Sequence, residues 1–279
     1  MSKLYRKTIF IFIIILLIII PFSKVHVFSS FSSSSKVLYL STYPEDAIEK
    51  KCKKCTKEPI DLVFYFHGAG GRVDDFAKPY SFGGLNLEKE NKFREDIVFL
   101  SFCYDTNFHW ASSDIVKDSI AEIHRTVNKF NVRKIILIGI SSGGTLALNI
   151  LSLADKKLQE KITNVLAVFP ITDYKYTEQN NKSEWLQEEL KKHFAQYKNP
   201  EIEEKNSSPI TWVSKIPSSV EIALVEGTND TLVNPAQIEK YYNELKKTNN
   251  NSVLIKLETN HLVSPYEKDF SEILNLILR

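Results

Sequence analysis

Short apolar runs and stretches of helical pattern alternate along most of the chain. Most of the runs are continuously apolar, which is typical of strands that are buried on both faces of a sheet. They lie at residues 37–40, 61–66, 97–104, 134–139, 164–169, 220–227 and 253–258. Because helical patterns separate them, we expect an α/β fold, with one mostly parallel, doubly wound sheet and helices on both of its faces.

The stretches between the runs repeat apolar residues at the spacing of a helix. The segment after Gly143 is apolar nearly all round, so the helix that it predicts should be central and buried. Asn234 followed by Pro235 is typical of a helix start. A single helical stripe is formed by Val116, Ile120, Ile123, Val127 and Phe130.

One connection is much longer than the others. About fifty residues separate the run at 164–169 from the run at 220–227, which exceeds an ordinary strand–helix connection. Within it, Leu186, Leu190 and Phe194 form one apolar edge. We expect a small helical cap at about residues 172–215, folded over one end of the sheet, with its tryptophans as cap or core anchors.

The N-terminus has a pattern of its own. A basic start, MSKLYRK, precedes twelve uninterrupted apolar residues at 9–20. This pattern is typical of a secretory signal, and the run is shorter than the roughly 20 residues of a membrane-spanning helix. We expect a signal peptide or signal anchor at 1–28, a Ser-rich spacer at 29–36 and the main domain at 37–279. The domain would then be extracytoplasmic, either secreted or attached to the membrane.

Composition and charge narrow the classes of function. Hydrophobic residues make up 43% of the chain and charged residues 25%, as in ordinary globular proteins. With a net charge of +2 and no basic stripe, we expect no nucleic-acid partner. Cys52 and Cys55 have C-x-x-C spacing without a second ligand pair, so we expect no metal site and a surface pair that is open to disulfide formation.

The segment GISSGG contains the first candidate for chemistry. Gly139 to Gly143 fits the frame Gly-x-Ser-x-Gly with Ser141 at its centre, whereas a frame on Ser142 would need glycine at Ile140. In this motif a strand turns abruptly into a helix and presents the serine at a strained apex, which small neighbours permit. The alternative is a glycine-rich packing turn, but the flanking strand and helix patterns favour a nucleophile.

A serine nucleophile needs a base, and the base needs an orienting carboxylate. Asp230 follows the run at 220–227 and His261 follows the last run, so both should lie with Ser141 at the carboxyl ends of parallel strands. Asp173 is a rival for the acid, one strand earlier. The sequence therefore predicts a catalytic Ser141, Asp230 and His261.

Backbone N–H groups should stabilise the oxyanion that forms on attack. The turn His67 to Gly71 ends an earlier strand and can supply one donor, for which the N–H of Ala69 is the first choice and that of Gly70 the alternative. The second donor would be the N–H of Ser142, whose hydroxyl we expect to be dispensable, so that Ser142→Ala should largely keep activity.

Three residues are predicted to bind substrate. Gly70 lies in the oxyanion turn, and His109 with Trp110 follows a strand end in the segment NFHW. For His109, simple loop packing is the alternative to a place on the pocket wall. His67 should have a structural, hydrogen-bonding role.

Together these motifs resemble the α/β-hydrolase superfamily from about Val37 onward. The chain has an H-G-x-G turn, the elbow GISSGG, the acid motif GTNDxxV and a late histidine, in that order. The sequence is similar to the esterase, dienelactone-hydrolase-like and peptidase-like branches of this superfamily. Two features depart from the pattern: the region before the oxyanion strand is short, and TNH replaces the common Gly-His.

The resemblance implies a serine hydrolase that forms an acyl-enzyme without a cofactor. Its substrate would be a small molecule with an ester, thioester or amide bond, and a carboxylesterase is the main hypothesis. A serine peptidase of the prolyl-oligopeptidase type is the alternative within this class. A non-catalytic binding protein with the same fold is the alternative outside it, although all triad positions are filled.

Overall fold

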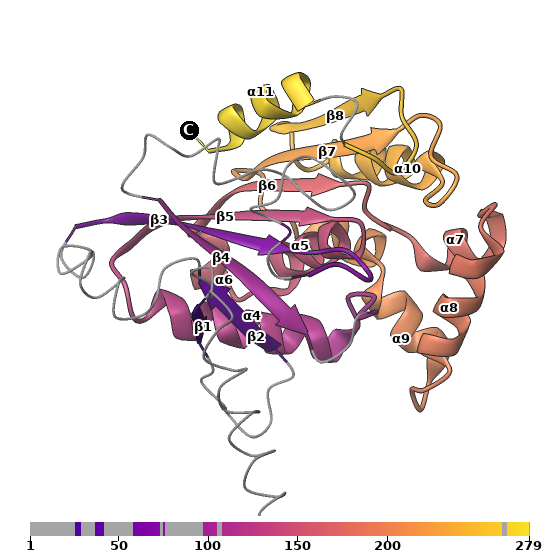
Figure 1. Cartoon of the computed structure of the whole chain (residues 1–279), viewed down its shortest axis with the longest axis horizontal. Helices are drawn as coiled ribbons and strands as arrows, with labels where there is room; N and C mark the ends of the chain where they lie inside the picture. The colour runs from indigo at the N-terminus through magenta and orange to yellow at the C-terminus, as the bar shows by residue number, and fades with distance from the viewer. Residues whose placement is uncertain are drawn as a thin grey trace, which may run out of the picture.

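The computed structural model describes residues 26–28, 37–41, 58–72, 75, 97–104, 108–263 and 267–278. In these ranges the chain forms one eight-stranded sheet with the order β1-β2-β4-β3-β5-β6-β7-β8 (Figure 1). The strands are β1 (His26–Phe28), β2 (Val37–Ser41), β3 (Ile60–Phe66), β4 (Ile97–Tyr104), β5 (Val132–Ile140), β6 (Ile162–Val168), β7 (Glu221–Gly227) and β8 (Ser252–Leu257).

Most neighbouring strands of the sheet are parallel. β3 pairs in parallel with β4 and β5, and the parallel pairing continues through β6, β7 and β8. Among the described strands, antiparallel pairing is confined to one edge of the sheet, where β1 pairs with β2 and β2 pairs with β4. The prediction of a mostly parallel sheet is therefore confirmed. β1 lies within residues 1–28, for which the sequence predicted a signal or anchor. It was not predicted as a strand, because three residues are too few to form a recognisable strand pattern.

The core lies on both faces of this sheet, as β3 illustrates. Leu62, Phe64 and Phe66 belong to one buried cluster, and the alternate residues Val63 and Tyr65 belong to another. Side chains of a strand point alternately to its two faces, so an uninterrupted apolar run indicates that both faces are covered.

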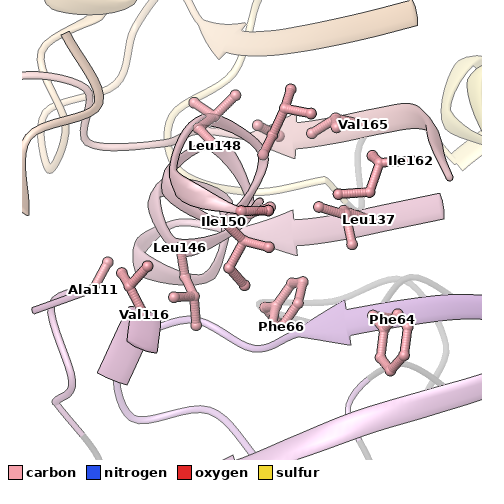
Figure 2. Close-up of a cluster of buried hydrophobic side chains, with 14 of the residues drawn as sticks. Phe64, Phe66, Ala111, Val116, Leu137, Leu146, Leu148, Ile150, Ile162 and Val165 are labelled. Carbon is pink, nitrogen blue, oxygen red and sulfur yellow. The ribbon is translucent and has the colours of Figure 1, made fainter. Parts of the chain in front are cut away.

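Helices cover the two faces. The main-domain helices are α4 (Ser113–Val127), α5 (Ser142–Leu153), α6 (Lys156–Gln159), α10 (Pro235–Leu245) and α11 (Glu267–Ile277). α5 packs against β5 and β6, and its apolar side chains lie over Phe66 and Leu137 (Figure 2). On the opposite face, Phe270 and Leu274 of α11 join the second cluster.

The helix predicted from the stripe at 116–130 is α4, but it is shorter than the stripe. It ends at Val127, and Asn128 is its C-terminal cap. Phe130 lies beyond that end, in the turn before β5, and still packs against the first cluster. The apolar spacing therefore continued past the helix because the turn also faces the core.

The long connection between β6 and β7 forms a group of helices. These are α7 (Tyr174–Asn180), α8 (Glu184–Phe194), α9 (Pro200–Ser207) and η2 (Pro209–Lys215). α7, α8 and α9 lie together beside the carboxyl ends of the parallel strands (Figure 1). We call them, with η2, the cap. Glu203 of the cap accepts hydrogen bonds from the backbone N–H and hydroxyl of Ser113, at 2.7 and 2.8 Å, and so attaches α9 to α4.

Two predictions concern residues outside the described ranges. The apolar run at 9–20 and the pair Cys52 and Cys55 are not among the residues that the structure describes. No helix within the described ranges has the length and apolar character needed to cross a membrane. The signal or anchor stays a prediction.

Candidate active site

Ser141 lies at the apex of a strained turn between β5 and α5. Its backbone has φ 54° and ψ −124°, and its N–H donates to the carbonyl of Val168 at 2.7 Å. A Cβ at Gly139 would lie 2.1 Å from the carbonyl oxygen of Gly143, and a Cβ at Gly143 would lie 2.0 Å from that of Phe66. Side chains cannot fit at such distances, so both glycines of the motif are required by packing.

His261 and Asp230 contact each other just beyond the ends of β8 and β7. His261 Nδ1 is 2.7 Å from Asp230 Oδ2, and both side chains are buried. The other carboxylate oxygen accepts the backbone N–H groups of Leu232 and Val233, each at 2.8 Å. A carboxylate only accepts hydrogen bonds, so Nδ1 carries the hydrogen and Nε2 is the basic nitrogen of the neutral ring.

The rival carboxylate, Asp173, has different partners. It accepts the N–H of Tyr176 at 3.0 Å as the N-terminal cap of α7, and it pairs with Lys240 at 2.9 Å. The first contact stabilises the start of α7, and the second is a surface ion pair. The structure therefore gives the histidine contact to Asp230.

Phe169 contacts His261 from the end of β6. Their ring centroids are 5.1 Å apart with an interplanar angle of 41°. Phe169 is fully buried and has φ 49°, a value that a bulky residue rarely adopts. Strain of this kind persists only where the surrounding structure enforces it. No pattern in the sequence indicates this contact.

The turn at 67–71 packs directly against the serine. A Cβ at Gly68 would lie 3.1 Å from both the Ile140 carbonyl oxygen and Ser141 Cβ. The turn is closed by the Gly71 N–H, which donates to the Gly68 carbonyl at 2.9 Å. Gly70 has φ 71°, in the left-handed region that favours glycine.

Ser142 begins α5 and is fully buried. The first N–H groups of a helix have no acceptor within the helix and carry the positive end of its dipole. The backbone N–H of Ser142 is therefore suited to an anion beside Ser141.

Ser141 opens into a cavity of about 290 Å³. Three aromatic rings form one wall: Phe108 and Trp110 stack with centroids 5.9 Å apart, and Trp185 of the cap lies 6.1 Å from Phe108. None of the lining residues is charged; they are Ala69, Gly70, Phe108, Trp110, Ser141, Ile171, Trp185, Leu186, Leu232 and Val233.

Two of the three predicted substrate-binding residues, Gly70 and Trp110, line this cavity. His109 is not among the lining residues and is fully buried, so its place differs from the predicted one. Phe108 and Trp185 were not predicted to bind substrate. Trp185 was expected to anchor the cap, but 48% of its surface is exposed.

The buried histidines near the turn make stability depend on pH. Burial lowers the pKa of His109 to about 3, with the charge of His67 as the second cause, and burial also lowers the pKa of His67. Unfolded histidine titrates near 6.5, so between pH 6.5 and 3 the unfolded state binds more protons than the folded state.

We therefore expect the free energy of unfolding to fall as the pH falls from 6.5 toward 3. Each histidine that stays neutral contributes a slope of up to about 1.4 kcal/mol per pH unit. Urea unfolding at several pH values measures it. His109→Gln should reduce the slope, and an unchanged slope would contradict the neutral state of His109.

The arrangement is that of an α/β-hydrolase: a parallel sheet, a serine on a strand–helix turn, and an aspartate–histidine pair at later strand ends. Residues 105–273, more than half of the chain, match the model of the prolyl oligopeptidase family. The chain belongs to this family and is a hydrolase. No group of histidine, cysteine and acidic residues that could hold a metal ion occurs in the described part of the chain.

Solved structures of esterases share the fold. Esterase 2 of Thermogutta terrifontis, phosphonylated by sarin, has a TM-score of 0.64 at 17% identity, covering 92% of this chain and 94% of that chain. Its propionate-bound form has a TM-score of 0.61 at the same identity and coverage. An esterase of Pyrococcus furiosus has a TM-score of 0.60 at 15% identity, covering 91% and 89%. The comparison with curated proteins found no match.

Proposed function

We propose that the protein is a serine carboxylesterase that acts through an acyl-enzyme on Ser141. The observation that carries the proposal is that Ser141 stands at a strained apex and lines an uncharged cavity. His261 and Asp230 are buried, their side chains are 2.7 Å apart, and they follow the ends of the neighbouring strands β8 and β7. These are the parts that nucleophilic catalysis by serine needs.

In the proposed mechanism, Ser141 Oγ attacks the ester carbonyl while His261 Nε2 takes the hydroxyl proton. Asp230 holds the imidazole in the required tautomer and stabilises its positive charge. The oxyanion of the tetrahedral intermediate accepts hydrogen bonds from the N–H groups of Ala69 and Ser142. His261 then protonates the leaving alcohol, and water attacks the acyl-enzyme in the reverse sequence.

The lining of the cavity favours a substrate with an uncharged, apolar acyl group. Its wall combines aromatic rings with aliphatic residues such as Ile171 and Leu232, and its volume of about 290 Å³ lies at the small end of the range of ligand pockets. Burial of apolar surface would favour such a group by about 0.8 kcal/mol for each methylene. Short acyl esters are therefore the proposed substrates.

A serine peptidase is the second candidate, and the family match favours it. Both reactions use the same nucleophile, base and oxyanion donors, so the substrate decides between them. Turnover of p-nitrophenyl esters from acetyl to dodecanoyl, measured beside peptide p-nitroanilides, separates the two. We expect the highest kcat/KM with short acyl esters. Faster cleavage of the anilides would favour the peptidase.

Trp185 should determine how well the acyl chain is bound. It reaches from the cap over the cavity and contacts Phe108, so Trp185→Ala would open the cavity to water. We expect KM for butyryl and hexanoyl esters to rise by about 10-fold, the scale of losing apolar contacts in a pocket, with a smaller change for acetyl esters.

Trp212→Ala is the matched control for this prediction. Trp212 is also a partly exposed tryptophan of the cap, but its indole donates to the Asn206 carbonyl at 2.7 Å and it does not line the cavity. Its KM values should stay close to those of the wild type. An equal rise in both variants would mean that the cap acts as a whole, and not through Trp185.

A further inference from the structure

The loop between β4 and α4 presents its side chains to two different places. Phe108 and Trp110 line the Ser141 cavity, whereas His109 between them is fully buried. Trp110 and Ala111 have φ values of 41° and 48°, so the chain is strained where it reverses. The Tyr174 hydroxyl donates to the Trp110 carbonyl at 2.5 Å and holds this strained turn.

The hydrogen bonds of His109 determine its tautomer. The Ala111 N–H donates to Nδ1 at 3.0 Å, so Nδ1 carries no hydrogen. In the neutral ring the hydrogen is therefore on Nε2. Nε2 lies 3.3 Å from Ser142 Oγ and 3.4 Å from the His67 carbonyl oxygen. Both distances are long, as is common when one hydrogen is shared between two acceptors.

These two acceptors belong to the two segments that would supply the oxyanion donors. The His67 carbonyl begins the turn that contains Ala69, and Ser142 begins α5. We propose that His109 is a positioning residue, whose Nε2–H fixes the spacing between the Ala69 and Ser142 N–H groups. The proposal rests on the proposed function, because it assigns those two groups to the oxyanion.

Preorganisation is the physical reason why such a contact matters. An oxyanion donor contributes about 10²–10³-fold to kcat, and it does so only when it already points at the developing charge. A displacement of about 1 Å can cost on the order of 10²-fold. Histidine suits this place because it accepts the Ala111 N–H and donates toward Ser142 at the same time. Glutamine can replace only the Nε2 donor, and asparagine only the Nδ1 acceptor.

The experiment compares His109→Asn with His109→Gln, and uses His124→Gln as the control for a histidine away from the site. His124 pairs with Asp155 on the surface of α4. For each variant we measure kcat and KM on p-nitrophenyl butyrate. We also measure the inhibition constant of a butyl trifluoromethyl ketone, whose adduct with a serine carries an oxyanion.

His109→Asn should lower kcat by about 10–100-fold with KM within about threefold, and the inhibition constant should rise in parallel. His109→Gln should keep kcat within about fivefold, because its amide N–H replaces Nε2–H. His124→Gln should match the wild type. If His109 only supported its loop through Nδ1, asparagine would be better tolerated than glutamine. That order of the two variants would overturn the proposal.

If His109→Asn does not fold, Ser142→Ala tests the proposal instead. It removes one of the two acceptors of the His109 ring and leaves the loop that carries His109 intact. A fall in kcat of about threefold with a parallel rise in the inhibition constant supports the proposal. Unchanged values of both would overturn it. An inactive wild type that does not bind the ketone would instead refute the proposed function, so the two failures are distinguishable.

Discussion

Ser141→Ala should abolish ester turnover and leave the fold intact. Loss of the nucleophile lowers kcat by about 10⁶-fold in enzymes of this kind. The alanine needs the same backbone, with φ 54°, and removes a single oxygen at the cavity surface. The free energy of unfolding should therefore change by less than about 1 kcal/mol. Steady-state turnover of p-nitrophenyl butyrate and urea unfolding measure the two effects.

Ser142→Ala provides the comparison for this variant. Its hydroxyl contacts His109, but the backbone N–H that would face the oxyanion is retained. We expect a loss of only severalfold, so most of the activity is kept, although the contact with His109 gives the hydroxyl a small role that the sequence did not predict. An equal loss in both variants would contradict the assignment of the attack to Ser141.

Asp230→Asn should have the next largest effect, a fall in kcat of roughly 10⁴-fold at neutral pH. Its Oδ1 can still accept the N–H groups of Leu232 and Val233, so the turn should keep its geometry. However, the amide carries no charge to stabilise the imidazolium. It can also present an N–H to His261 Nδ1, which would favour the tautomer that cannot act as the base. The pH profile of kcat measures the loss.

Asp173→Asn is the matched control, since it makes the same chemical change one strand earlier. Asparagine is also a good helix N-cap, so the main loss is the pair with Lys240, a lysine that is half exposed. Stability should fall by about 1 kcal/mol or less, and kcat should be retained. If Asp173→Asn alone abolished turnover, Asp230 would not be the acid.

The sheet and the position of Ser141 could be predicted because both depend on local patterns. Runs such as 61–66 are uninterrupted since both faces of β3 are buried. Gly139 and Gly143 are required by contacts within one turn and with β3. Asp230 and His261 could be paired because each follows the end of a strand, and because the chain order is serine, aspartate and histidine.

The surroundings of the site could not be predicted, because they depend on packing between distant segments. His109 and Trp110 are neighbours with the same sequence signal, yet the strained backbone buries one and leaves the other on the cavity wall. Trp185 reaches the cavity only through the placement of α8. The strained Phe169 beside His261 is an ordinary strand-end residue in the sequence, and only the three-dimensional contact gives it a role.

Covalent labelling is the most direct test of Ser141 as an activated nucleophile. The folded wild-type protein is incubated with a fluorophosphonate, a reagent that phosphonylates activated serines, and the adduct is located by peptide mass spectrometry. We expect one adduct on Ser141, which is absent in Ser141→Ala and much slower to form in Asp230→Asn. No labelling of the folded wild type, or labelling that persists in Ser141→Ala, would contradict it.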